Sequence, residues 1–180
     1  AMAGSAYDGV AIRDVLQMSS GARWVEDYTD PESDVNRLGA VMAGLATLDD
    51  FVCGIEREAP PATVCRYNSG ETQALGMLLR AATGRSVADY MQTELCEPLG
   101  FQDGGYWLTD LEGVEMVLGG LNLTARDFLR IGELYRCGGV WDGRQVVPAD
   151  WVEASVRSDA PHLQPGRVIV GDHAFPFGYG

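Results

Sequence analysis

The chain has 180 residues, of which 46% are hydrophobic, so it is long enough for one domain with a sizeable core. Its formal net charge is −13, and all 13 of its basic residues are arginines. A nucleic-acid-binding surface needs clustered cations, so this balance argues against a nucleic-acid partner. No stretch reaches the roughly 18 consecutive apolar residues of a membrane-spanning helix, so the sequence predicts no membrane span.

Metal and cofactor chemistry find little support in the residue types. The cysteines are widely spaced and include no Cys-x-x-Cys pair. The only histidines, His162 and His173, lie in segments rich in proline and glycine, away from every cysteine. Zinc sites group such side chains, so we expect neither a metal nor a cofactor. We expect a soluble protein without a signal peptide in this stretch, and its compartment stays open.

The first third of the chain predicts three helices. Helical spacing of apolar residues runs over residues 10–20, and Gly21 is placed to end that helix in the left-handed conformation. Ser33 and Thr47 each precede an amphipathic run and are typical N-caps. The prolines that follow the third run break the helical pattern before residue 64.

An acidic stretch over residues 24–34 lies between the first two predicted helices. Such a run of carboxylates is typical of a solvated loop. Loops also carry functional residues, and here Trp24 and Tyr28 could supply an apolar wall for a ligand. We therefore keep both side chains as candidate substrate-binding residues.

Residues 64–70 read VCRYNSG and lead into the most regular helical pattern of the sequence. Alternation up to Tyr67 predicts a short strand, and residues 71–83 predict a helix that Gly84 ends. The hydroxyl groups of Tyr67 and Ser69 then lie at a helix N-terminus, which suits an oxygen-rich or anionic ligand as well as a plain N-cap. Tyr67 taken alone is typical of a half-buried aromatic at a strand end. The predicted buried stripe of this helix comprises Leu75, Leu78, Leu79 and Ala82.

The second half of the chain alternates helices with short strands. Ser86 and Thr124 are predicted N-caps, and Pro148 suits the first turn of a further helix. The strand candidates are residues 106–108, 114–117, 167–170 and 175–180, and residues 141–148 predict a turn followed by a short strand.

Four segments taken in order resemble the serine β-lactamase-like hydrolases, in particular class C-type esterases and 6-aminohexanoate-dimer hydrolases. They are residues 67–73 (YNSGETQ), 97–101 (EPLGF), 119–127 (GGLNLTARD) and 141–151 (WDGRQVVPADW). The resemblance covers roughly residues 6–156. It implies a mainly α chain with short β pieces, corresponding to the helical lobe of the β-lactamase/transpeptidase-like α/β fold.

The resemblance also implies roles for individual residues. Tyr67 and Ser69 match a Tyr-x-Ser element, in which the tyrosine relays protons and the serine holds a lysine and the substrate by hydrogen bonds. Asn122 matches a position on a loop that faces the cleft. An amide there could equally satisfy the backbone of its own loop, so both readings stay open.

The chain contains no lysine, so it cannot form the Ser-x-x-Lys nucleophile turn of the resembled family. Arginine stays protonated and cannot take a proton from serine. We therefore expect residues 1–180 to be a single partial domain, an internal piece of an ester- or amide-cleaving serine hydrolase. A catalytically silent binding or structural module of the same fold is the alternative. Apolar surface left uncovered on this piece would favour self-association.

Overall fold

The computed structural model describes residues 2–164, 166–170 and 173–177, and within them it is mainly helical with short antiparallel strand pairs. The helices are α1 (Ile12–Leu16), α2 (Asp34–Met42), α3 (Leu48–Cys53), α4 (Ser69–Thr83), α5 (Val87–Met91), α6 (Glu97–Leu99), α7 (Ala125–Arg136) and α8 (Ala149–Ser155). A π-helical turn, η1 (Gln92–Cys96), joins α5 to α6, and a 3₁₀ turn, η2 (Pro161–Leu163), follows α8. The strand pairs are β1–β2 (Tyr106–Trp107 and Leu121–Asn122), β3–β4 (Val140–Trp141 and Arg144–Gln145) and β5–β6 (Gly166–Val170 and His173–Phe177).

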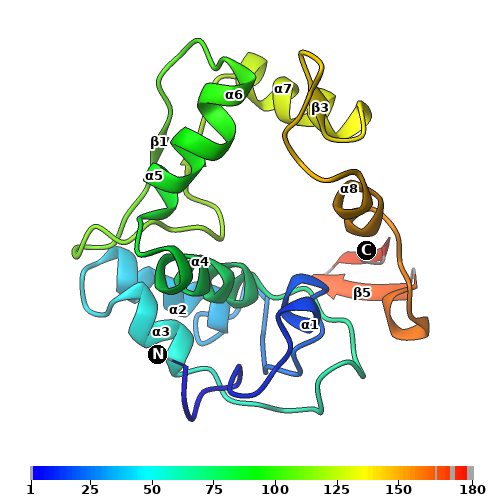
Figure 1. Ribbon diagram of the computed structural model, residues 1–180. Coiled ribbons are helices and arrows are strands. Elements are labelled where there is room, and N and C mark those ends of the chain that lie inside the picture. The colour runs from blue at the N-terminus through cyan, green and yellow to red at the C-terminus, as the bar shows by residue number, and fades with distance from the viewer. Residues whose placement is uncertain (1, 165, 171–172, 178–180) are drawn as a thin grey trace.

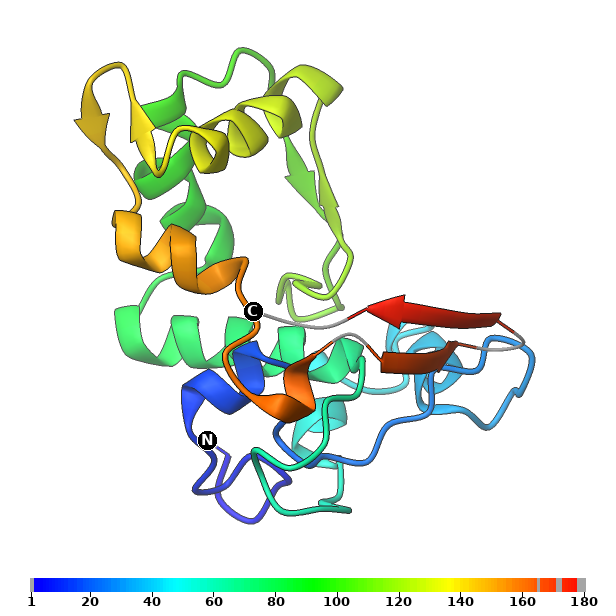
Figure 2. The same cartoon turned by 90° about the vertical axis from the view of Figure 1, so that its right-hand side faces the viewer.

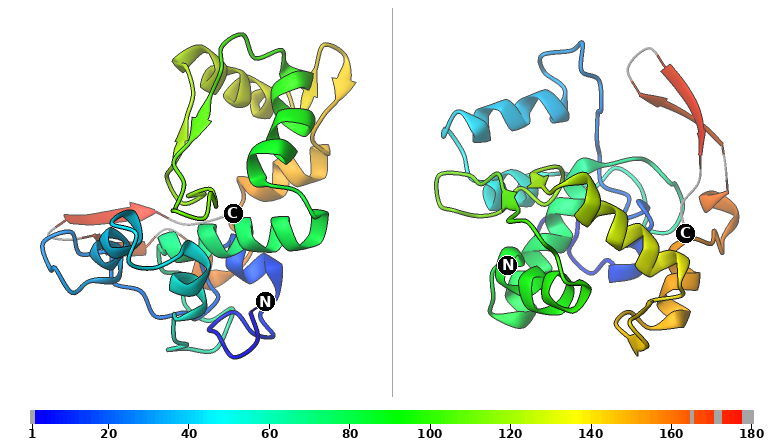
Figure 3. Two further views of the ribbon diagram at one scale, coloured as in Figure 1. Left: turned by 90° about the vertical axis from the view of Figure 1, so that its left-hand side faces the viewer. Right: turned by 90° about the horizontal axis from the view of Figure 1, so that it is seen from above.

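Helix α4 lies across the middle of the molecule, with α1, α2 and α3 on one side of it (Figure 1). Of these, α1 and α3 pack directly against α4. The chain then rises through α5 and α6, runs along α7 at the far end and returns through α8 (Figures 1 and 2). The β5–β6 pair lies at the edge of the molecule (Figure 3). The element that carries Tyr67 and Ser69 is therefore the central one.

The principal core lies between α4 and the first three helices. Trp24 and Phe51 meet edge to face there, with ring centroids 6.2 Å apart. The buried members of this core are Ala6, Tyr7, Val15, Ala22, Trp24, Leu38, Val41, Leu48, Val52, Ile55, Ala74 and Met116. This core packs against the N-terminal half of α4 and holds that half in place.

Helix α4 buries a different face from the predicted one. The predicted leucine stripe is only half-buried, and Ala82 is exposed. The buried face instead includes Gln73, whose amide donates to the Glu115 carbonyl at 2.9 Å and accepts from the Val117 N–H at 2.8 Å. Gly76 on the same face has no room for a Cβ, which would meet Val117 Cγ2 at 2.5 Å. This face of α4 is buried because the loop that contains Glu115 and Val117, distant in sequence, packs on it.

The predicted N-caps are confirmed. The side chains of Ser33, Thr47, Ser86 and Thr124 each accept a hydrogen bond from the backbone N–H three residues later. Gly84 ends α4 in the left-handed conformation, as predicted, with φ of 69°. These termini depend on the bonds of adjacent residues, which the sequence displays directly.

Two predictions near the N-terminal half are wrong. Helix α1 ends at Leu16 rather than Ser20, and Met18 follows it at a positive φ of 52°. Residues 64–67 form no strand; the Arg66 N–H instead bonds to the Met18 carbonyl at 2.8 Å. One cause explains both differences. Residues 18–22 pair with residues 57–66, so the backbone groups of both segments form hydrogen bonds with each other rather than within a longer helix or a strand.

The predicted strands in the second half fare unevenly. The β1, β4 and β5 predictions are confirmed at shifted bounds, whereas residues 114–117 make only one isolated bridge, between Thr109 and Glu115. The predicted strand at the end is seen as β6, and its last residues, 178–180, lie outside the described residues.

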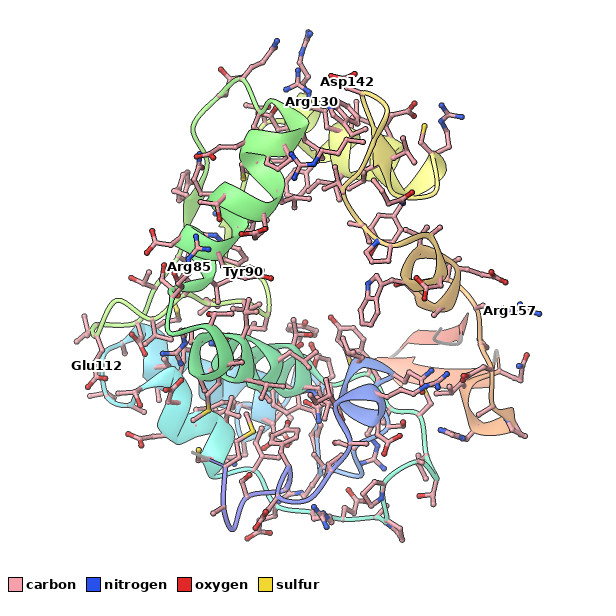
Figure 4. All side chains as sticks on the ribbon, in the orientation of Figure 1. Arg85, Tyr90, Glu112, Arg130, Asp142 and Arg157 are labelled. Atoms are coloured by element: carbon pink, nitrogen blue, oxygen red, sulfur yellow. The ribbon has the colours of Figure 1, made fainter. Side chains whose placement is uncertain are left out.

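Arg85 lies over the Tyr90 ring where the chain leaves α4, with its guanidinium carbon 5.4 Å from the centroid (Figure 4). No helix in the described part of the chain has both the length and the apolarity needed to cross a membrane.

Candidate active site

The candidate site is organised around one carboxylate, Glu26. The Ser69 hydroxyl donates to Glu26 at 3.2 Å from each of its oxygens. The Trp24 indole N–H donates to Glu26 Oε2, and the Tyr28 hydroxyl donates to Oε1 at 2.7 Å. Three of the five predicted site residues, Trp24, Tyr28 and Ser69, therefore converge on a carboxylate in the stretch predicted to be a solvated loop.

Local hydrogen bonds fix the loop that carries Glu26. Asp34, the first residue of α2, accepts from the Val25 N–H at 2.9 Å. The Asn36 amide donates to the carbonyls of Asp27 and Asp30, at 3.2 Å and 2.8 Å. These bonds fold the loop back onto the start of α2, and the buried Trp24 ring holds its other end in the core.

Asn68 begins the helix that carries Ser69. It has an extended φ of −148°, and its side-chain oxygen accepts from the Glu71 N–H at 3.3 Å, so Asn68 is the N-cap of α4. Position 70 requires a glycine, because a Cβ there would lie 2.6 Å from Ile55 Cδ1 and 3.1 Å from Trp24 Cζ3. The close contact with Trp24 brings Ser69 within reach of Glu26.

The carboxylate shapes the chemistry of its neighbours. The hydrogen bond to Glu26 is the main cause that raises the pKa of Tyr28 to about 12, with smaller contributions from burial and from the charges of Glu26 and Tyr67. Tyr67 is half-buried and close enough to Tyr28 to influence that pKa. Among the described residues, none of the ion pairs includes Glu26, so its negative charge is bonded only by neutral donors.

The five candidate residues differ in exposure. Trp24 is 3% exposed, so its ring is part of the core and only its N–H reaches the cluster. Tyr28 is 63% exposed and stands at the surface, where a ligand could reach it. Contact of either side chain with a substrate stays a prediction.

Asn122 lies apart from this cluster, on β2 and opposite Tyr106. Its side-chain amide donates to the Gly120 carbonyl at 3.0 Å, which is the local backbone bond foreseen as the alternative. Within the described residues, no hydrogen bond joins Asn122 to the Glu26 cluster. Its contact with a substrate likewise stays a prediction.

A sequence signal for Glu26 did exist. An acidic side chain two residues from both a tryptophan and a tyrosine can bond to both polar hydrogens, as it does here. Searched over the described residues, the His, Cys, Asp and Glu side chains form no group of three that could hold a metal ion.

Comparison with known proteins gives a consistent result. A family model described as beta-lactamase matches residues 1–180. The curated 6-aminohexanoate-dimer hydrolase of Paenarthrobacter ureafaciens is 30% identical over 161 residues, which is 85% of this chain and 41% of the relative.

Solved structures show the same fold at lower identity. A Bacillus anthracis structure named for 6-aminohexanoate-dimer hydrolase has a TM-score of 0.81 at 23% identity, and the match covers 99% of this chain and 48% of that one. A penicillin-binding protein homologue from Caulobacter crescentus has a TM-score of 0.62 at 18% identity, covering 97% of this chain and 55% of that one. The chain thus spans about half the length of these proteins, or less, and it belongs to the beta-lactamase family.

Proposed function

We propose that this chain is the helical lobe of a serine hydrolase that cleaves an ester or amide through an acyl-enzyme. Membership of the beta-lactamase family supports this, as does 30% identity to a 6-aminohexanoate-dimer hydrolase. The observation that carries the proposal is the bond between Ser69 and Glu26, because it determines what the serine hydroxyl can still do.

A serine hydroxyl has one hydrogen to donate and two lone pairs that accept. Glu26 takes the hydrogen of Ser69, so the lone pairs stay available for an ammonium group or a substrate N–H. The uncompensated negative charge of Glu26 favours a cation beside Ser69. A lysine ammonium from a Ser-x-x-Lys turn supplies such a cation, and the same positive charge favours the phenolate form of Tyr67.

The reaction follows from these roles. A serine outside these residues attacks the carbonyl carbon, and its proton passes to the Tyr67–lysine pair. Backbone N–H groups stabilise the oxyanion, the leaving alcohol or amine takes the proton, and water then hydrolyses the acyl-enzyme. Because this chain has no lysine, residues 1–180 form a partial domain that supplies Tyr67, Ser69 and one wall of the cleft. The substrate we propose is an ester or amide of one of three types: a β-lactam, a simple ester or a 6-aminohexanoate oligomer.

The test uses the full-length protein that contains this chain. Intact mass after treatment with a serine-reactive fluorophosphonate probe is expected to show one adduct, mapped outside the 180 residues. Tyr67→Phe is expected to lower kcat at least tenfold with the probe-labelled serine in place. Unchanged hydrolysis in Tyr67→Phe would remove the role of Tyr67.

The competing proposal is a catalytically silent binding or structural module of the same fold, and the absence of a lysine in the chain motivates it. Two observations decide between them. A full-length protein without Ser-x-x-Lys, which takes up no probe and hydrolyses neither an ester nor 6-aminohexanoate dimer, supports the silent module. Probe uptake together with hydrolysis supports the enzyme.

A further inference from the structure

A second group of polar side chains is buried directly below the Tyr67–Ser69 turn. Tyr7, Ser20, Asn68 and Glu71 are each at most 5% exposed. Three of their polar atoms have no hydrogen-bond partner among the described residues: Tyr7 OH, Asn68 Nδ2 and Glu71 Oε2. Buried polar atoms are rarely left unpaired in native proteins, so three together need an explanation.

Contacts on α4 show how the group is held. Glu71 Oε1 accepts from the Ser20 hydroxyl at 2.5 Å and from the Ser20 N–H at 3.4 Å. The Asn68 side-chain oxygen accepts from the Glu71 N–H at 3.3 Å. Each side chain therefore uses one oxygen for the fold, and its other polar atom is left over.

The leftover atoms belong to one neighbourhood. Burial raises the pKa of the Tyr7 hydroxyl well above its ordinary value, the charge of Glu71 raises it further, and the Asn68 side chain lowers it. The pKa of Tyr7 thus depends on both Asn68, the N-cap of α4, and Glu71, in its first turn.

We propose that Tyr7, Asn68 and Glu71 enclose an ordered water that bonds to all three leftover atoms, and that Glu71 thereby positions the Tyr67–Ser69 turn. A water molecule can accept from the Asn68 amide, donate to the Glu71 carboxylate and exchange a hydrogen bond with the Tyr7 hydroxyl. Asn68 stands between Tyr67 and Ser69 in the chain, so fixing its side chain fixes both neighbours. The positioning role rests on the proposed function; the water site does not.

The site also responds to pH. Burial raises the pKa of Glu71 to about 7 against the lowering effect of the Ser20 hydrogen bonds, and the charge of Asp14 on α1 adds to the rise. Among the described residues, the charge of Glu71 also raises the pKa values of Tyr7 and Cys65, and Glu58 and Arg66 border the same cavity as Glu71. Around neutral pH, Glu71 Oε2 therefore changes from a hydrogen-bond donor to an acceptor toward the water.

The experiment compares Glu71→Gln, Glu71→Leu and the exposed control Glu112→Gln in the full-length protein (Figure 4). A high-resolution crystal structure of the unsubstituted protein is expected to show a water within hydrogen-bond distance of the three atoms. The infrared band of a protonated carboxyl group is expected to titrate near pH 7 and to vanish in Glu71→Gln. A dry site overturns the water site whether or not the protein is active. An unchanged band in Glu71→Gln overturns the assignment of the pH response to Glu71.

The positioning role has its own readout. Glu71→Gln keeps an oxygen for Ser20, so we expect kcat within threefold of the unsubstituted value and a pH profile without the step near pH 7. Glu71→Leu is expected to lower kcat at least tenfold at a KM changed less than threefold, and Glu112→Gln to change neither. A kcat step near pH 7 that persists in Glu71→Gln, or a full kcat in Glu71→Leu, overturns the positioning role.

Discussion

Ser69 donates its hydroxyl hydrogen to the carboxylate of Glu26, 43 residues earlier in the chain, with 3.2 Å to each oxygen. This contact joins the N-terminus of α4 to an acidic loop that would otherwise be solvated. Trp24 and Tyr28 bond to the same carboxylate from within that loop. One side chain thus sets the relative positions of three predicted site residues, Trp24, Tyr28 and Ser69.

Removing the Glu26 carboxylate should destabilise this part of the protein. Glu26→Ala leaves the buried Trp24 N–H without a partner, which costs about 1–3 kcal/mol of unfolding free energy. Urea unfolding monitored by tryptophan fluorescence measures the loss. Glu32→Ala, an exposed carboxylate of the same loop, is the matched control and should lose under about 0.5 kcal/mol. Equal losses in the two variants would contradict the central place of Glu26.

The same carboxylate should control the titration of Tyr28. Without the bond to Glu26, the phenol of Tyr28 should titrate closer to its ordinary value of about 10 than to about 12. Because the folded pKa lies above the unfolded one, this bond stabilises the fold up to about pH 10 and is lost between about pH 10 and 12. Phenolate absorbance of Glu26→Gln against the unsubstituted protein checks this, with Tyr28→Phe identifying the residue. A titration that Glu26→Gln leaves in place would assign the shift elsewhere.

Asp127 at the start of α7 should contribute stability that depends on acid pH. Burial alone would raise its pKa, but hydrogen bonds from the Gln102 N–H at 3.2 Å, Thr124 hydroxyl at 3.0 Å and Arg130 at 2.5 Å hold it below the ordinary value. A lowered pKa means that this stability is present above about pH 4 and is lost as the pH falls below it.

Asp127→Asn should therefore lower the urea midpoint at pH 7 and flatten the dependence of stability on acid pH. The matched control is Asp142→Asn, an exposed turn residue at φ of 46°, a conformation that asparagine tolerates (Figure 4). Asp142→Asn should change neither quantity. An acid dependence that survives in Asp127→Asn would assign it to another carboxylate.

Gly21 should be far less replaceable than Gly9, although both have positive φ. Gly21 has φ of 79°, and a Cβ there would clash with the Ala59 carbonyl oxygen, whereas Gly9 at 72° faces open space. Gly9→Ala should cost about 1–2 kcal/mol through backbone strain alone. Gly21→Ala should cost more than that, because residues 56–62 must move away. Thermal unfolding of the two variants measures these costs. Equal costs would show that the contact between Gly21 and residues 56–62 yields without a loss of stability.

Self-association of the 180-residue chain should depend on the apolar side chains around α1 and α8. Ile12, Leu16 and Trp151 are 54%, 38% and 48% exposed around a groove of about 440 Å³. Leu16→Ser with Trp151→Ser should shift the chain toward monomer in light scattering after size exclusion, because apolar patches drive association. Leu111→Ser, at an exposed leucine outside this groove, should not. An unchanged mass in the double variant would place the association surface elsewhere.

Much of the local structure was predictable, because its causes lie within a few residues of each other. Ser33, Thr47, Ser86 and Thr124 cap helices with their own side chains, and Gly84 ends α4 because it adopts a positive φ without strain. The family was equally readable, because short segments such as residues 119–127 keep their order and spacing.

The site and the buried face of α4 were decided by contacts between distant segments. Periodicity shows that α4 has an apolar stripe, but only the loop that bonds to Gln73 determines which face is covered. Glu26 reads as one more solvated carboxylate until the core around Trp24 brings it to Ser69. The sequence by itself determined where α2, α3, α5 and α7 begin, where α4 ends and which family the chain belongs to, since those depend on neighbouring residues. The tertiary structure alone decided which carboxylates became partners, because burial and hydrogen bonding depend on residues 43 to 51 positions apart.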